Sequence, residues 1–150
     1  MTHNITILTH DPRWKGLSPT VKRAAEAALK ARKVKKAAVT IVLSNDVEIQ
    51  TLNRQYRAKN KPTNVLSFPD GEVVEGVTQL GDIILAYETI VREAGEQGKK
   101  FKSHLTHLTI HGVLHLLGFD HEVEAEAEIM ERYEIAILGS MGIANPYESA

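Results

Sequence analysis

Residues 111–121 read His111-Gly112-Val113-Leu114-His115-Leu116-Leu117-Gly118-Phe119-Asp120-His121. The apolar residues between the first two histidines predict a helix, on which positions i and i+4 lie on the same side. We expect Gly118 to end this helix, because glycine enters left-handed backbone conformations without a side-chain penalty. The chain can then return and bring His121 toward His111 and His115. The spacing therefore predicts that three imidazoles meet at one point.

Three imidazoles are typical ligands of a transition metal, and the chain has no cysteine that could replace them. We predict one zinc ion per chain, held by His111, His115 and His121. Three protein ligands leave the fourth position open, which distinguishes a catalytic zinc from a structural one. Imidazole also binds nickel, copper and iron, so the ligand types favour zinc without fixing it. The pattern indicates a metal-dependent hydrolase.

The spacing H-x-x-x-H-x-x-G-x-x-H also occurs in the metzincin proteases, where a glutamate after the first histidine serves as general base. Here Gly112 occupies that position. Glycine inside a helix costs about 1 kcal/mol relative to alanine, so a need for space must favour it. The space serves either close backbone packing or a bulky substrate group such as a phosphate. Without the carboxylate, a zinc peptidase or amidase is the less favoured alternative.

Two further histidines precede the motif on the same helical stripe. At 1.5 Å per residue, His104 lies ~10 Å along the axis from His111, and His107 lies ~12 Å from His115. These separations are too large for one ion. We interpret both as residues that orient a ligand or face the substrate, with ordinary packing as the alternative. We predict His107 as a substrate-binding residue.

Length and composition limit the class of protein. A chain of 150 residues can bury one core, and we expect a single domain over residues 1–150. The formal net charge of -1 gives no global positive field, so any polyanion must be bound by a local basic patch. We expect no secretory leader, because residues 1–4 lack its basic start and apolar core, and no apolar run reaches the ~20 residues that span a bilayer. We therefore expect a cytoplasmic protein with no membrane partner.

Alternation and helical periodicity predict the remaining elements. Strands are expected over residues 4–9, 37–43, 65–68 and 80–86, the last buried on both faces and therefore central. Helices are expected after Ser18 as N-cap, after Asn45 in a capping box with Glu48, over 87–94, over 102–117, and through Ala125–Ile137. These elements predict an α+β fold with an about four-stranded mixed sheet and about five helices, one of them a metzincin-like zinc-binding helix.

Two of these helices carry apolar stripes that we expect to face the core. The stripe of the helix after Asn45 comprises Val47, Ile49, Leu52 and Tyr56. In the last helix it comprises Ala125, Ile129, Tyr133, Ala136 and Ile137, with Glu124, Glu126, Glu128 and Glu131 facing outward.

A basic segment precedes the strand at 65–68, and its cations are Arg54, Arg57, Lys59 and Lys61. A zinc hydrolase without a carboxylate base still needs a cation to stabilise an anionic transition state. Guanidinium offers paired hydrogen bonds to phosphate oxygens, so we predict Arg57 as the catalytic residue. We predict the other three as substrate-binding residues, and a solvated basic surface is the alternative.

Three segments together resemble the bacterial rRNA-maturation endoribonucleases of the YbeY type: His111–His121, Thr63-Asn64-Val65-Leu66-Ser67-Phe68-Pro69 and Gly81-Asp82-Ile83. The resemblance extends from about Ala37 to Tyr147. It implies the zinc-ligand role for the three histidines of the motif and a functional role for Arg57. It also implies a contact of Asp82 with a small ribosomal subunit protein. Asn64 and Phe119 depart from the aspartate and tyrosine that are common in this family.

The resemblance implies a zinc-dependent endoribonuclease specific for single-stranded RNA. Its expected roles are 16S rRNA 3′ end maturation and ribosome quality control. We expect zinc to lower the pKa of a water toward ~7 and Arg57 to neutralise the phosphate, while that water or the ribose 2′-hydroxyl attacks. A non-catalytic, zinc-containing ribosome assembly factor is the alternative from another class.

Overall fold

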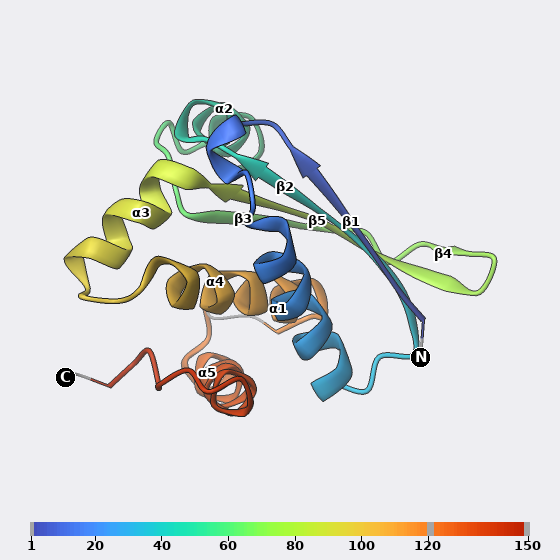
Figure 1. The fold of residues 1–150 in the computed structure, drawn as a ribbon. Coiled ribbons are helices and arrows are strands. Elements are labelled where there is room, and N and C mark those ends of the chain that lie inside the picture. The colour runs from blue at the N-terminus through green and yellow to red at the C-terminus, as the bar shows by residue number, and fades with distance from the viewer. Residues whose placement is uncertain (1, 120–121, 149–150) are drawn as a thin grey trace.

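The computed structural model describes residues 2–119 and 122–148, in which helices pack on a mixed sheet (Figure 1). The strands within these residues are β1 (Thr2–Thr9), β2 (Lys36–Ser44), β3 (Val65–Pro69), β4 (Val73–Val74) and β5 (Val77–Ala86). The helices are α1 (Ser18–Ala31), α2 (Asp46–Arg57), α3 (Tyr87–Glu96), α4 (Phe101–Leu116) and α5 (Glu124–Ser140), with a short 3-10 helix, η1 (Pro12–Trp14). The α+β prediction is confirmed. None of the helices described is both long and apolar enough to cross a membrane.

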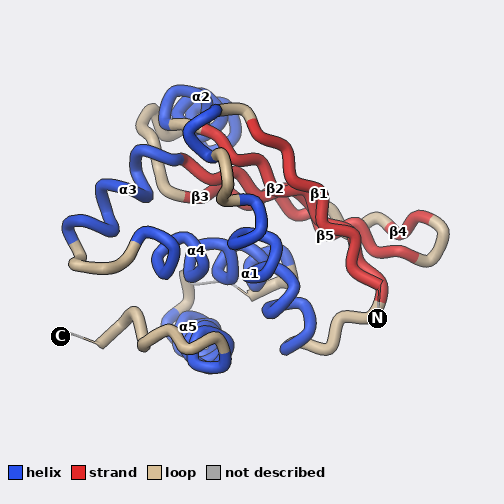
Figure 2. Tube along the Cα trace, in the orientation of Figure 1, coloured by secondary structure: helices blue, strands red, loops and turns tan. Residues whose placement is uncertain are grey.

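The sheet has the strand order β1-β2-β5-β3, and β4 pairs with β5. β1, β2 and β5 are parallel, whereas β3 and β4 run antiparallel to β5. The central position expected for residues 80–86 is confirmed, because β5 lies between β2 and β3. The fifth strand, which the sequence did not predict, is β4. It forms a hairpin with the start of β5 that projects from the body (Figure 2).

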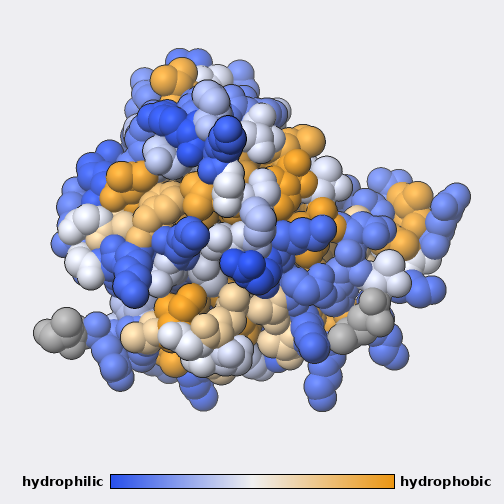
Figure 3. Space-filling model, in the orientation of Figure 1, coloured by the Kyte–Doolittle hydropathy of each residue, from blue (hydrophilic) through white to orange (hydrophobic). Residues whose placement is uncertain are grey.

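The hairpin carries exposed apolar side chains at its end. Val73 is 63% and Val74 46% exposed, and Figure 3 shows hydrophobic atoms on this projection. The turn between the strands consists of Glu75 and Gly76, with φ of 51° and 79°. Positive φ at both central residues is what a tight two-residue hairpin turn requires.

Helices cover the two faces of the sheet unequally. On one face α1 and α4 pack over a large core that includes Ile83 and Leu85 of β5, and α5 lies beyond α4 (Figure 1). On the other face, α2 covers a smaller cluster built on Ile49 and Ile84. The rest of this second face borders a groove of about 550 Å³. Alternate residues of β5 therefore serve the two faces, as the pleat of a strand requires.

α4 lies at the centre of the molecule. Residues 104–110 are all buried, and the helix contacts α1, α3, α5, β3 and β5. Because it is covered on several sides, this helix lacks the single buried stripe of an amphipathic surface helix. The hydroxyls of Thr106 and Thr109 donate to carbonyls of the preceding turn, at 2.7 and 2.9 Å. These buried polar groups are thus satisfied within the helix itself.

Gly112 lies where α4 meets β5. A Cβ at this position would stand 3.1 Å from Cγ2 of Ile83 and 3.2 Å from its Cδ1. Both distances are tighter than an ordinary van der Waals contact. The glycine therefore permits close packing of the helix on the sheet, which is the first of the two explanations that its sequence position allowed.

The N-caps predicted from the sequence are confirmed for α2 but not for α1. The Asn45 side chain caps α2, since its Oδ1 accepts from the backbone N–H of Glu48 at 2.9 Å. In a capping box the Glu48 carboxylate would bind the backbone N–H of Asn45 in return. Here it binds Ser44 Oγ and His10 Nδ1 instead. At α1 the prediction was one residue off: Leu17 is the N-cap, without a side-chain bond.

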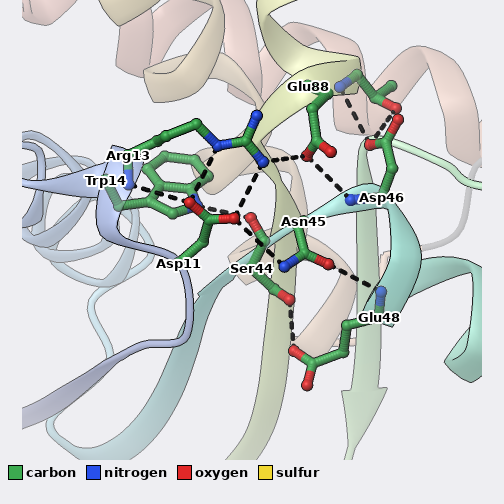
Figure 4. A network of polar contacts seen from close by, with 9 residues as sticks. Asp11, Arg13, Trp14, Ser44, Asn45, Asp46, Glu48 and Glu88 are labelled. Carbon is green, nitrogen blue, oxygen red and sulfur yellow. Dashed lines mark hydrogen bonds and ion pairs between the residues drawn. The ribbon is translucent and has the colours of Figure 1, made fainter.

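A polar network at the carboxyl ends of β1 and β2 fixes α2 against α3 (Figure 4). Asp46 Oδ1 accepts from the backbone N–H of Thr89 at 3.2 Å, and Glu88 Oε1 accepts from the N–H of Asp46 at 3.1 Å. Arg13 Nη2 joins Glu88 to Asp11, at 3.1 and 3.0 Å. Hydrogen bonds from Arg13 hold the pKa of the Asp11 carboxyl well below its usual value. The network thus orients the helix that ends at the predicted catalytic arginine.

The predicted stripes of α2 and α5 were partly wrong. In α2, Ile49 and Asn53 are buried, whereas Val47 and Tyr56 are 76% and 66% exposed. In α5 the buried residues are Met130, Glu134, Ile137 and Leu138. Of the α5 stripe, only Ile137 is fully buried, and Ile129 is 40% exposed. The face that α5 turns to the core is therefore rotated by about one residue, and it includes a carboxylate.

Candidate functional site

His111 and His115 lie one turn apart on α4 and line a cavity of about 80 Å³ with Arg57. Residues 65–67 of β3 complete this cavity, which we call the Arg57 cavity. β3 is an edge strand, and the arginine comes from α2 on the opposite face of the sheet. The site therefore forms where a helix from each face meets the edge of the sheet.

Two contacts with β3 position the Arg57 side chain. Its Nη2 donates to the carbonyl oxygen of Ser67 at 2.7 Å, and its guanidinium carbon lies 5.6 Å from the centre of the Phe68 ring. The backbone after Arg57 turns sharply, because Ala58 has a left-handed conformation with φ of 56°. The buried Asn53 side chain then donates to the carbonyl of Lys61 at 2.9 Å and ties down the following loop.

Glu134 of α5 is a site residue that the sequence analysis missed. Its side chain is 1% exposed. Its Oε2 accepts from His111 Nδ1 at 3.2 Å, while its Oε1 accepts from His107 Nε2 at 2.5 Å and from the Tyr147 hydroxyl at 2.6 Å. Burial alone would raise the pKa of Glu134, but the hydrogen bonds from the two histidines outweigh it and lower the pKa to about 2. The buried group is therefore a carboxylate that accepts from three side chains.

This carboxylate determines how His111 can act. A hydrogen bond from Nδ1 to a carboxylate places the proton on that nitrogen, so Nε2 carries the lone pair that a metal requires. His107 is linked to His111 through the same carboxylate. Its structural environment is therefore that of an orienting residue, and its substrate-binding role stays a prediction.

His104 has a carboxylate partner of its own. His104 Nε2 donates to Glu93 Oε1 at 2.9 Å, and the histidine is 4% exposed. Burial lowers the pKa of His104 despite the opposing effect of the nearby Glu93 carboxylate. His104, His107 and His111 together line a second cavity of about 500 Å³.

The other predicted residues lie apart from the Arg57 cavity. Arg54, Lys59 and Lys61 are exposed and do not line it. Asp82 is exposed on the face of the sheet that α2 partly covers, in the 550 Å³ groove.

The third predicted ligand, His121, falls outside the described residues. Within residues 2–119 and 122–148, no three His, Cys, Asp or Glu side chains are grouped so that they could hold a metal ion. The two described ligands do fit one: both are imidazoles in one cavity, and a carboxylate orients the first. Carboxylates commonly hold metal-binding histidines in this way.

Comparisons with known proteins identify the family of the chain. The family model for "Endoribonuclease YbeY" matches residues 6–142. A protein of that name from Parvibaculum lavamentivorans is 48% identical over 155 residues, covering 95% of this chain and 84% of the relative. The one from Azorhizobium caulinodans is 46% identical over 151 residues, covering 95% of each. The solution structure of TM1509 from Thermotoga maritima superimposes with a TM-score of 0.62 at 28% identity, over 97% of this chain and 96% of that one. The chain therefore belongs to the YbeY family of endoribonucleases, which are hydrolases that act on RNA.

Proposed function

We propose that the chain is a zinc-dependent endoribonuclease specific for single-stranded RNA. We further propose that it acts in 16S rRNA 3′ end maturation and in ribosome quality control. The observation that supports this most directly is the shared cavity of Arg57, His111 and His115. A cation beside two imidazoles suits a phosphodiester, whose transition state is anionic. Family membership favours RNA over peptide as the substrate.

In this proposal zinc is held by His111, His115 and His121. Bound zinc would supply a Lewis acid and lower the pKa of a water molecule. The chain contributes the orientation of the ligands. Glu134 fixes the tautomer and the ring plane of His111, and the closely packed α4 keeps His111 and His115 on one side of the helix.

Arg57 is proposed to bind the scissile phosphate. Guanidinium has five N–H donors, and the bond to Ser67 uses one of them. That bond fixes the direction of the planar group, so less side-chain entropy is lost when a phosphate binds. The attacking group is either water or the ribose 2′-hydroxyl. Products with 2′,3′-cyclic phosphate ends would identify the second route.

The face of the sheet with Asp82 is proposed to bind a small ribosomal subunit protein. Asp82 is exposed in a groove whose other lining includes the apolar Leu8, Val42 and Ile84. A carboxylate beside an apolar surface can orient a protein partner. Asp82→Lys should weaken binding of the purified small subunit, and unchanged binding would remove this part of the proposal.

The central experiment compares Arg57→Ala with Arg132→Ala on a labelled single-stranded RNA. Both variants remove one exposed arginine from a helix, but only Arg57 lines the cavity. We expect kcat/KM to fall about 10²- to 10³-fold for Arg57→Ala and less than about threefold for Arg132→Ala. Folding and zinc content are measured in both.

Two results would contradict the proposal. Equal cleavage by the two variants would indicate a contaminating nuclease or another site. If the folded, zinc-loaded parent protein leaves the RNA intact, the non-catalytic assembly factor becomes the better hypothesis. Chelation followed by zinc addition tests the metal separately, because activity should disappear and return.

A further inference from the structure

The 500 Å³ cavity beside the Arg57 cavity has no part in the function proposed above. It is enclosed by α3, α4 and the segment after α5, and we call it the Tyr147 cavity. It shares His111 and Val65 with the Arg57 cavity. Because the two cavities adjoin, an RNA strand whose phosphate lies at Arg57 would also pass the second cavity with a neighbouring nucleotide. Its volume lies within the range of small-molecule sites, about 300–1,000 Å³.

The walls of the Tyr147 cavity are held in place. Lys99 Nζ donates to the carbonyl of Pro146 at 3.1 Å, which ties the C-terminal segment to the loop after α3. The Tyr147 hydroxyl donates to Glu134, and its ring packs edge-on against His107 with 5.4 Å between ring centres. Tyr147 nevertheless remains 44% exposed. The cavity thus presents part of an aromatic ring that is already fixed in position.

The polar groups of the cavity suit a neutral heterocycle better than a second phosphate. The Glu93 carboxylate, which accepts from Asn64 and His104, would repel a phosphate. The amide groups of Asn64 and Gln97 and the ammonium of Lys99 add donors and acceptors around it. RNA bases present both donors and acceptors on their edges and a flat face for stacking. The carboxylate therefore selects against phosphate, while the mixed lining suits a base.

We propose that the Tyr147 cavity binds one unstacked base of the RNA, from a nucleotide next to the scissile phosphate. This inference rests on the proposed function, because it places the phosphate at Arg57. Base binding in this cavity would explain how a site with one small catalytic cavity favours single strands, since a base in a duplex cannot turn out of its stack without losing its pairing.

The test combines a blocked cavity with RNAs that lack one base. Gln97→Trp places a large side chain at the rim, and Glu96→Trp places the same side chain on the neighbouring exposed residue, which does not line the cavity. The substrates are single-stranded oligonucleotides with one cleavage site and one abasic nucleotide at each adjacent position in turn. We expect one abasic position to lower kcat/KM about tenfold for the parent protein and for Glu96→Trp. Gln97→Trp should cleave the unmodified RNA about tenfold more slowly and show no further loss.

A second pair of variants covers the case in which Gln97→Trp does not fold. Tyr147→Phe keeps the ring and should keep the tenfold preference for the intact base, whereas Tyr147→Ala should lose it. Thermal unfolding of each protein accompanies the kinetics.

The outcomes separate this inference from the proposed function. If RNA is cleaved but no abasic position matters, or if the blocked variants keep the preference, the base site is wrong and the endoribonuclease activity stands. If the parent protein does not cleave the oligonucleotides, the proposed function fails, and fluorescence anisotropy on the same RNAs decides the inference. A tenfold difference in Kd that disappears in Gln97→Trp supports the base site, and equal Kd values overturn it.

Discussion

Glu134 joins three side chains that the sequence keeps apart. His107 and His111 come from α4, and Tyr147 comes from the segment after α5, yet all three donate to this one carboxylate. A buried charge is tolerated only when hydrogen bonds replace the water that it has lost. The site is therefore built around an anion that itself does not line the Arg57 cavity.

We expect Glu134 to strengthen zinc binding by orienting His111. Glu134→Gln keeps the shape of the side chain but removes the charge that fixes the tautomer of His111. We expect the zinc affinity to fall about 10- to 100-fold, measured by competition with a chromophoric chelator. Glu128→Gln, an exposed change on the same helix, is the control. Equal zinc affinity in the two variants would show that Glu134 does not orient a ligand.

The residues of the site differed in how far the sequence could predict them. His111, His115 and Arg57 have motif spacing or a charge in a basic segment, and the structure brings them into one cavity. Glu134 gave no such signal, because its partners lie 23 and 27 residues away. One clue was present: it stands four residues from both Met130 and Leu138, on what proves to be the buried face of α5. A carboxylate among apolar positions of a helix predicts a buried partner.

At the scale of elements, the packing of β5 against β3 depends on Gly81. A Cβ there would lie 2.1 Å from the carbonyl oxygen of Phe68, and the residue has φ of 131°. Gly81→Ala should therefore lower the free energy of unfolding by about 3–4 kcal/mol, since backbone cannot move aside as a flexible side chain can. Urea unfolding, followed by the fluorescence of the single buried Trp14, measures this. Gly139→Ala lies in α5, where a Cβ meets no atom within 4 Å, so it should keep the stability or raise it by up to about 1 kcal/mol. Similar losses in both variants would contradict the argument.

The edge strand β1 is held to α1 by an ionisable contact. His3 binds the Glu26 carboxylate through Nδ1, and its Nε2 donates to the carbonyl of Val34 at 2.6 Å. Burial opposes the charged form, but these hydrogen bonds outweigh it and raise the pKa of His3 above 6.5. A group with a raised folded pKa stabilises fully below its unfolded pKa, and this contribution disappears as the pH rises through the folded value.

The stability difference between the parent protein and His3→Gln should therefore be largest below pH 6.5 and shrink as the pH rises above it. Urea unfolding at several pH values, monitored through Trp14, provides the measurement. A difference that stays constant or grows with pH would show that His3 is neutral in the folded protein.

Periodicity predicted where the helices and strands lie in the sequence more reliably than it predicted which side of a helix faces the core. β5 and α4 were predicted within a few residues, because long apolar runs leave little choice. The stripes of α2 and α5 failed because each helix buries a polar residue: Asn53 satisfies the Lys61 carbonyl, and Glu134 satisfies two histidines. Hydrophobic periodicity cannot detect a polar residue that is buried for its hydrogen bonds. The two-residue β4 was too short to produce any alternation.

At the scale of the whole molecule, the positive charge that could attract RNA is confined to one region of the surface. The net charge is -1, so RNA must be attracted by the exposed cations near the end of α2 and not by the protein as a whole. With Arg54, Arg57, Lys59 and Lys61 as the contacts, log K for single-stranded RNA should fall with log salt at a slope of about -3. The variant with Lys59→Ala and Lys61→Ala should show a slope of about -1.5.

The matched control is a second pair of exposed lysines, Lys33 and Lys35, which follow α1 near the other end of the sheet (Figure 1). Changing both to alanine alters the net charge equally but should leave the slope unchanged. Fluorescence anisotropy from low to high salt gives all three slopes. Equal slopes in the two double variants would place the RNA elsewhere.

The central position of α4 has a consequence for the order in which the molecule opens. α4 contacts three helices and two strands, so it cannot detach without separating from all five. Its backbone amides should therefore exchange their protons with solvent only when the whole chain unfolds, while those of the β4 hairpin exchange early. His111 and His115 would then keep their relative positions through all smaller fluctuations, including those that admit or release a ligand.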